Sequence, residues 1–329
     1  MPVKFIRNFI KLEASGGIIL FAAALIAIII DNSPLSPYYE QLLEIPLSVH
    51  VGSYALSKHL LHWVNDGLMV LFFLLVGLEI KREIVEGELN SIPKVILPAL
   101  AALGGMIVPA AVYSLINHGN AISMRGWAIP TATDIAFSLG IISLLGTRVP
   151  ISLKIFLTAL AIFDDLGAII VIAIFYTEQL STSALMLALF FLFILLLLNR
   201  ASVRSLLPYI LVGACMWLCL LQSGVHATLA GVALAFLIPL KSDENKYSPA
   251  KWLIAQLHPW IIYLVLPIFA FTNAGVSFHD VPPGLANIFS PVMLGILLGL
   301  LVGKMIGVFG TTFLAIKLRL VKMPHNANW

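Results

Sequence analysis

The segment ALAIFDDLGAII, residues 159–170, places two adjacent carboxylates inside a run of apolar residues. The apolar run extends from about residue 151 to residue 176, and roughly 20 apolar residues are enough for a helix to cross a bilayer. The segment therefore predicts a transmembrane helix. If the helix begins near Ile155, Asp164 lies ~14 Å along it, at about 1.5 Å per residue. A charge at this depth costs several kcal/mol and usually faces a cavity or a partner.

The composition extends this interpretation to the whole chain. Of the 329 residues, 60% are hydrophobic and 11% are charged, whereas soluble domains average about 25% charged residues. The composition therefore excludes an ordinary soluble protein and predicts an all-α transmembrane bundle. We expect ten spans, near residues 14–30, 60–79, 95–116, 121–144, 151–176, 183–199, 206–221, 224–240, 250–274 and 291–315.

The basic residues predict the orientation of these spans. Of the nineteen Lys and Arg residues, Lys58 and Arg125 fall on one side of the predicted topology and Lys304 falls inside a span, and all others fall on the opposite side. Basic loops face the cytoplasm, so both termini are expected to be cytoplasmic. No basic run is interleaved with aromatic residues, so nucleic acid is not an expected partner.

The segment 45–57 differs from the other loops. Leu47, Val49 and Val51 alternate with Ser48 and His50, and a period of two is typical of a strand. We therefore predict a small β-hairpin outside the membrane.

The aspartate pair is the first candidate site. Neighbouring positions on a helix point about 100° apart, so Asp164 and Asp165 cannot share one environment. Burial raises the pKa of a carboxyl group and a nearby cation lowers it. A carboxylate tuned towards neutral pH holds either a proton or a hard cation such as sodium, which is the minimum chemistry for exchange. The alternative is a buried acid pair with no transport role.

The segment GWAIPTATDIAF, residues 126–137, is the second candidate. Pro130 removes a backbone hydrogen bond from an apolar span, which predicts a broken helix. Freed carbonyls and the hydroxyls of Thr131 and Thr133 can bind a cation, and Asp134 can compensate a helix end. The alternative is a simple proline kink with a capping acid.

Lys304 lies deep in the last predicted span. It requires an anionic partner, and Asp164 and Asp165 are both candidates. The pair either opens and closes as sodium and protons bind, or is a static ion pair.

Weaker signals occur near the expected membrane surfaces. The run Glu79, Lys81, Arg82, Glu83 and Glu86 is either the mouth of a cation funnel or a solvated helix end. His226 begins a span, where interfacial hydrogen bonding and pH sensing are both possible roles, because histidine changes charge near neutrality. We interpret the His258-Pro259-Trp260 motif as an interfacial anchor.

These residues together resemble the NhaA-type bacterial sodium/proton antiporters. The similarity runs from about Gly16 to Leu320. Its most specific parts are residues 72–79, 126–137, 161–170, 223–231 and 269–276.

The resemblance implies roles for individual residues. Asp164 and Asp165 match the family's pair that binds cation and protons, and Thr133 and Asp134 match its broken-helix site. Lys304 matches the lysine that interacts with the pair. The positions linked to pH response are Glu79, Arg82, Glu83 and His226.

The resemblance also implies an activity and an architecture. Family members export sodium or lithium for more than one proton, without a cofactor, and dimerise through the hairpin that matches residues 45–57. They are an established example of inverted repeats with broken helices, and they have twelve spans. We therefore expect residues 1–329 to be a single antiporter domain that lacks the family's last two spans. The acidic residue that some relatives carry before His258 is absent. A cation channel and an inactive fragment remain alternative interpretations.

Overall fold

The computed structural model describes residues 2–51, 54–87, 92–133, 149–176, 180–240, 248–278 and 290–323. The described residues are mostly helical and divide into two compact units, each of which combines an early and a late part of the chain. The first unit comprises residues 1–82 and 176–281. The second comprises residues 83–175 and 282–329.

The first unit contains a long N-terminal helix, a strand pair and a group of apolar helices. Its elements are α1 (Pro2–Asp31), α2 (Ser36–Leu43), β1 (Pro46–Val51), β2 (Tyr54–His59), α3 (Leu60–Trp63), most of α4 (Met69–Val85), α9 (Thr182–Arg200), α10 (Leu206–Leu221), α11 (Leu229–Leu237), α12 (Pro249–Trp260) and α13 (Leu266–Asn273). A π-helical turn, Val64–Leu68, joins α3 to α4, and another, Ile261–Val265, joins α12 to α13.

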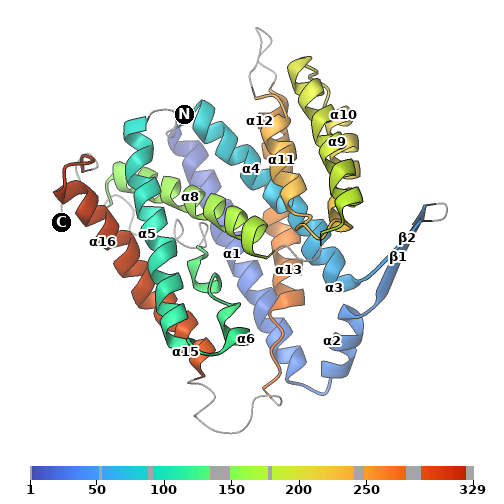
Figure 1. The fold of residues 1–329 in the computed structure, drawn as a ribbon, viewed down its shortest axis with the longest axis horizontal. Coiled ribbons are helices and arrows are strands. Elements are labelled where there is room, and N and C mark those ends of the chain that lie inside the picture. Colours follow the sequence, from blue (N-terminus) through green and yellow to red (C-terminus); the bar gives the residue numbers. More distant parts are fainter. Residues whose placement is uncertain are drawn as a thin grey trace. The chain divides into compact units, whose positions relative to one another are not determined.

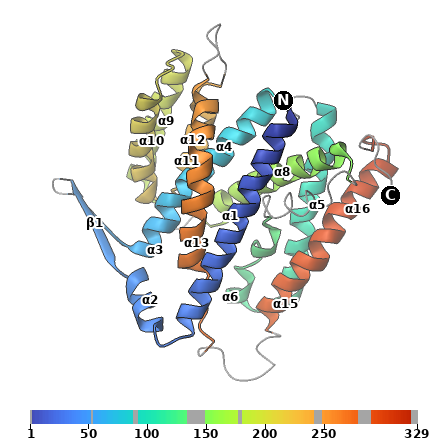
Figure 2. The same ribbon diagram turned by 180° about the vertical axis from the view of Figure 1, so that it is seen from behind.

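Polar contacts fasten α1 and α2 to the α13 region, and Figures 1 and 2 show α1 running beside α13. Asn32 donates to the carbonyl of Val276 at 2.7 Å, and the hydroxyl of Tyr39 donates to the carbonyl of Phe271 at 2.6 Å. Such contacts contribute about 0.6 kcal/mol each between membrane helices. The chain bends by 118° between α1 and α2, so Ser36 begins a new helix and does not continue α1.

The strand pair occupies the segment where the sequence alternates. β1 and β2 are antiparallel, with Pro46 opposite His59 and Val51 opposite Tyr54. The indole of Trp63 donates to the carbonyl of Leu47 at 3.0 Å, which fastens β1 to the helix that follows. The location of this strand pair outside the membrane and its role in dimerisation stay predictions.

The second unit contains α5 (Ile92–Ile116), α6 (Ala121–Met124), a 3₁₀ turn at Ile129–Thr131, α8 (Ile151–Phe175), α15 (Pro291–Leu298) and α16 (Lys304–Lys317). A π-helical turn, Gly299–Gly303, joins α15 to α16. This continuous helix runs beside α5, and α8 crosses α5 (Figure 1). A Cβ atom at Gly167 of α8 would meet Sδ of Met106 of α5 at 2.2 Å, so a larger residue at this crossing would require the end of the Met106 side chain to move.

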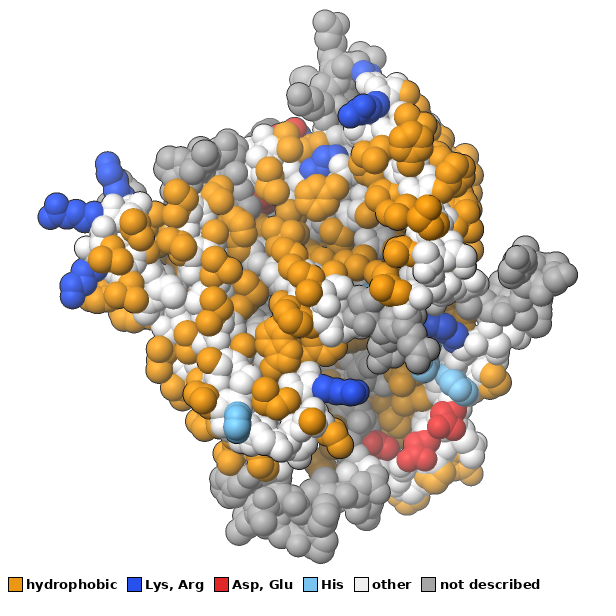
Figure 3. Space-filling view, viewed as in Figure 1, with side chains coloured by type: hydrophobic (Ala, Val, Ile, Leu, Met, Phe, Trp, Pro, Cys, Tyr) orange, Lys and Arg blue, Asp and Glu red, His pale blue; other side chains and the backbone are white. Residues whose placement is uncertain are grey.

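Hydrophobic side chains cover most of the face shown in Figure 3. Phe21, Phe193 and Leu301 are each more than half exposed, as expected for side chains that face lipid. Five described helices are long and apolar enough to cross a membrane, and the bent α1–α2 pair is a sixth candidate. The chain is therefore a multi-pass membrane protein. The expected ten spans and the inverted repeat stay predictions, since residues 134–144 of the fourth expected span lie outside the described residues.

Candidate ion-binding site

A buried ion pair joins two helices of the second unit. Lys304 is the first residue of α16, and its Nζ lies 3.0 Å from Oδ2 of Asp164 on α8. The side chain of Asp164 is fully buried and that of Lys304 is 15% exposed. Two charges in a low-dielectric interior require each other, because removing either leaves an uncompensated ion.

The 3₁₀ turn beside this pair supplies backbone oxygens. After Pro130 the chain leaves helical geometry, and Ala132 is extended, with φ −67° and ψ 153°. The Lys304 ammonium donates to the carbonyl of Thr131 at 2.6 Å and to that of Ala132 at 3.4 Å. The sequence predicts that carbonyls freed near Pro130 can bind a cation. In this structure the ammonium group of Lys304 binds the carbonyls of Thr131 and Ala132.

Asp164 has a further polar neighbour and an open coordination position. The hydroxyl of Thr133 donates to Oδ2 of Asp164. Oδ1 is buried and has no hydrogen-bond partner among the described residues. Gly105 of α5 faces this oxygen, at 3.9 Å from the position that a Cβ atom would take. A buried carboxylate oxygen, a hydroxyl and two carbonyls form the oxygen-rich set that hard cations prefer.

Asp165 differs from its neighbour. It follows Asp164 on α8 but is partly exposed. The sequence allowed either aspartate as the partner of Lys304, and the structure pairs Lys304 with Asp164. Asp134, the remaining predicted member of this site, lies outside the described residues. The structure thus brings together Thr133, Asp164 and Lys304.

The predicted pH-response residues are distant in sequence from Asp164 and Lys304. Glu79 and Arg82 are in the first unit, as is His226, whereas Glu83 is assigned to the second unit. Oε1 of Glu79 lies 3.7 Å from Nδ1 of His258. We interpreted His258 as an interfacial anchor, so its contact with Glu79 is a feature that the sequence did not reveal.

Lys81 is a second residue whose contacts the sequence did not reveal. Its ammonium donates to the carbonyls of Phe236 at 2.8 Å and Ile238 at 2.5 Å. These carbonyls lie at the C-terminal end of α11, where a cation also complements the helix dipole. Lys81 lies beyond the predicted 60–79 span, and burial lowers its pKa to about 8, from 10.5.

The lowered pKa of Lys81 predicts a pH-dependent stability. The unfolded chain holds the Lys81 proton more tightly than the folded chain, so unfolding takes up a proton between pH 8 and pH 10.5. We therefore expect the stability contributed by this group to rise with pH across that window. The measurement compares melting temperatures of the wild type and Lys81→Gln from pH 7 to pH 10.5. Lys317→Gln, which changes an exposed lysine, is the control. Parallel curves for the wild type and Lys81→Gln would contradict the prediction.

Three glycines set the position of Lys304. Gly299, Gly303 and Gly307 recur every four residues and face α5 and the 3₁₀ turn. A Cβ atom at Gly303 would meet Cα of Pro109 at 2.9 Å, and one at Gly307 would meet the carbonyl oxygen of Gly104 at 2.2 Å. Small residues at this spacing allow membrane helices to approach closely. The spacing is visible in the sequence and could have predicted this interface.

Gly307→Ala tests whether this close approach positions the ion pair. The added methyl group must push α16 from α5, because the atom that it meets is a backbone oxygen. Overpacking of this kind costs about 1–3 kcal/mol, so we expect a lower melting temperature and weaker ion exchange. A Cβ atom at Gly310 meets nothing within 4 Å, so Gly310→Ala is the matched control. Equal behaviour of the two variants would show that the contact is unimportant.

Comparison with known proteins adds independent information. Residues 7–329 match the family model described as Na⁺/H⁺ antiporter 1. The "Na(+)/H(+) antiporter NhaA 1" of Pseudomonas putida KT2440 is 56% identical over 329 residues, which cover 100% of this chain and 82% of the relative. The "Na(+)/H(+) antiporter NhaA" of Rhodospirillum rubrum is 54% identical and the "Na(+)/H(+) antiporter NhaA 1" of Syntrophotalea carbinolica is 51% identical. Both alignments cover 100% of this chain and 83% of the relative.

Proposed function

The chain belongs to the NhaA-type Na⁺/H⁺ antiporter family, and from this premise we propose that Asp164 and Asp165 exchange sodium or lithium for protons in the bacterial inner membrane. The protein is a transporter rather than an enzyme, with sodium ions and protons as its substrates. It exports sodium, driven by the proton-motive force, and contributes to pH and sodium homeostasis, with both termini in the cytoplasm. The observation that carries the proposal is the buried Asp164–Lys304 pair beside a non-helical segment.

The pair provides a means of competition between ions. Lys304 compensates Asp164 and donates to the carbonyls of Thr131 and Ala132. A sodium ion that binds Asp164 and Asp165 takes over that compensation, so the ammonium of Lys304 leaves the carboxylate. Thr133 and the unbonded Oδ1 of Asp164 are then available as oxygen ligands.

Proton binding reverses these changes. When Asp165 is protonated and Lys304 again pairs with Asp164, the site has no net charge left to hold sodium. In this proposal Asp165 releases one proton when sodium binds and the displaced Lys304 ammonium releases a second, so more than one proton leaves for each sodium ion. Asp134 supplies a further negative charge at the broken helix in this proposal.

Regulation and assembly form the remainder of the proposal. Glu79, Arg82, Glu83 and His226 adjust activity to cytoplasmic pH. The 3.7 Å contact between Oε1 of Glu79 and Nδ1 of His258 supports a role for this end of α4. Two chains form a homodimer through the 45–57 hairpin, where β1 and β2 present a paired ribbon.

Everted membrane vesicles test the exchange directly. Respiration acidifies the vesicle interior, and an antiporter dissipates the pH gradient when sodium or lithium is added. We expect this response with both ions, and none with choline as the control cation. A cation channel would instead carry a sodium current under voltage clamp that is independent of any proton gradient, and that result would overturn the proposal.

A further inference from the structure

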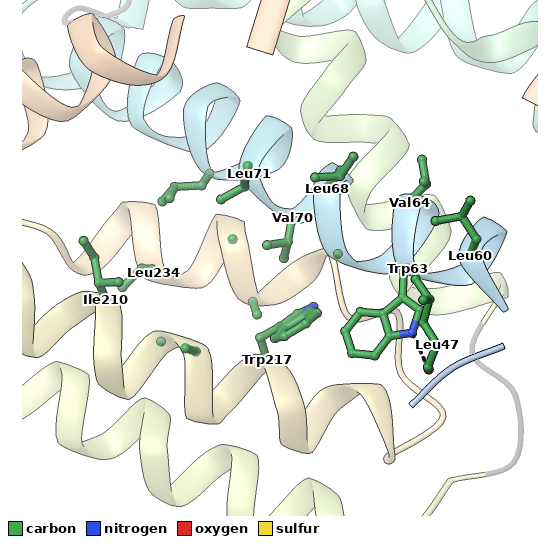
Figure 4. Close-up of a pocket in the computed structure, with 16 residues that line it drawn as sticks. Leu47, Leu60, Trp63, Val64, Leu68, Val70, Leu71, Ile210, Trp217 and Leu234 are labelled. Carbon is green, nitrogen blue, oxygen red and sulfur yellow. Dashed lines mark hydrogen bonds between the residues drawn. The ribbon is translucent and has the colours of Figure 1, made fainter. Parts of the chain in front are cut away.

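An apolar cavity of about 540 Å³ lies in the first unit, whereas the groups assigned to exchange belong to the second unit. Its lining comes from β1, from α3 and α4 with the π-helical turn between them, and from α10 and α11. Figure 4 shows Ile210 and Leu234 at one end and Leu47 at the other, with the ring of Trp217 between them. This volume is within the range of about 300–1,000 Å³ typical of ligand sites.

The cavity offers an occupant almost no hydrogen bonds. The indole N–H of Trp63 is donated to the carbonyl of Leu47, as the dashed line in Figure 4 shows. The indole N–H of Trp217 is donated to the carbonyl of Asp66 at 2.8 Å. All other lining residues are aliphatic or glycine. An occupant therefore gains from burial of apolar surface and not from polar contacts.

A charged pair lies beside the cavity. Lys58 and Asp66 are neighbours of Trp63 and Trp217, which line the cavity. Nζ of Lys58 lies 3.4 Å from Oδ2 of Asp66, and both side chains are more than a quarter exposed. One positive and one negative group are thus exposed side by side next to the apolar space.

The combination matches a zwitterionic phospholipid. One acyl chain is wholly apolar, and the headgroup carries an adjacent phosphate and ammonium that are complementary to Lys58 and Asp66. Tryptophan is enriched where membrane proteins meet the headgroup region. An acyl chain is also the most abundant apolar ligand available to a membrane protein, whereas a polar small molecule would find no partners in the cavity.

We propose that this cavity binds one acyl chain of a phosphoethanolamine phospholipid, with the headgroup held at Lys58 and Asp66. The ammonium of the lipid contacts the Asp66 carboxylate and the phosphate contacts Lys58. The lipid joins α4 to α10 and α11 by filling the space between them.

Photochemical labelling of the purified full chain tests the proposal. The probe is a phosphatidylethanolamine with a diazirine in one acyl chain, and the labelled peptides are identified by mass spectrometry. We expect labelling of the α4, α10 and α11 segments that line the cavity. Excess unlabelled phosphatidylethanolamine should suppress this labelling while leaving that of the exposed Phe193 surface on α9 less affected. Equal suppression at both places would overturn a specific site.

Two variants of α10 separate the cavity from the general lipid-facing surface. Ala214 lines the cavity, and its neighbour Cys215 is exposed but does not line it. Ala214→Phe fills the space and should reduce labelling of the cavity about tenfold, which corresponds to 1.4 kcal/mol. Cys215→Phe adds a similar ring and should leave labelling unchanged. Undiminished labelling of Ala214→Phe would overturn the proposal.

The headgroup contact has a test that leaves the cavity intact. Asp66→Asn removes the charge that faces the lipid ammonium but retains the carbonyl that accepts from Trp217. We expect the wild type to prefer phosphatidylethanolamine to a phosphatidylglycerol probe with the same acyl chains, and Asp66→Asn to lose this preference. Equal labelling of the wild type by both probes would overturn the assigned headgroup. Sodium/proton exchange should persist in all these variants, so failure of the lipid site is distinguishable from failure of the proposed function.

Discussion

Sodium/proton exchange in everted vesicles should fall to background in Asp165→Asn and in Asp164→Asn. An asparagine side chain keeps the size of aspartate but neither releases a proton at physiological pH nor compensates a bound sodium ion. Asp164 is fully buried against Lys304 and Asp165 is partly exposed, so the two losses have different causes. Asp165→Asn removes a proton carrier, and Asp164→Asn removes the anion for which sodium and Lys304 compete.

The control for this prediction is Glu40→Gln. Glu40 is an exposed carboxylate on α2, so its replacement removes the same charge without touching the site. We expect exchange by Glu40→Gln at the wild-type rate. Retention of exchange in Asp165→Asn, with normal protein levels in the vesicles, would refute the assignment of this aspartate.

Lys304→Met should strongly destabilise the protein. Methionine has a similar length, but the substitution leaves the Asp164 carboxylate buried without its cation. Removing one partner of a buried pair typically costs about 3–5 kcal/mol, which should appear as a large fall in melting temperature in detergent.

The double variant Asp164→Asn/Lys304→Met separates stability from transport. With both charges gone, no buried ion lacks a partner, and we expect most of the lost stability to return. Exchange should remain absent, because the double variant has no group for which sodium and a proton compete at this position. A melting temperature that stays as low as that of Lys304→Met would show that the lysine stabilises the protein through its carbonyl contacts rather than through the ion pair.

Sequence patterns were sufficient to predict the helical class and a contact between the aspartate pair and Lys304. Apolar runs of spanning length predicted the membrane helices, and charges at depth drew attention to Asp164, Asp165 and Lys304 because such charges are costly. The pattern could not decide which aspartate Lys304 contacts. That choice depends on the rotation of α8 about its own axis, which places Asp164 against Lys304 of α16.

Some contacts between residues distant in sequence were not predictable. Lys81 reaches carbonyls about 155 positions away, and Glu79 contacts His258 on another helix. A run of mixed charges at a helix end does not reveal, from the sequence alone, whether its side chains contact another helix or solvent. The apolar cavity likewise forms where Trp63 and Trp217, which lie on separate helices, come together. The sequence of either helix alone does not reveal it.

Proton release upon sodium binding is the most direct test of the central claim that sodium and protons compete for Asp164 and Asp165. Purified protein in weakly buffered detergent solution is mixed with sodium chloride, and a pH-sensitive dye reports released protons. We predict proton release with sodium, none with choline chloride, and loss of release in Asp165→Asn. Sodium binding without proton release, or unchanged release in Asp165→Asn, would contradict the claim.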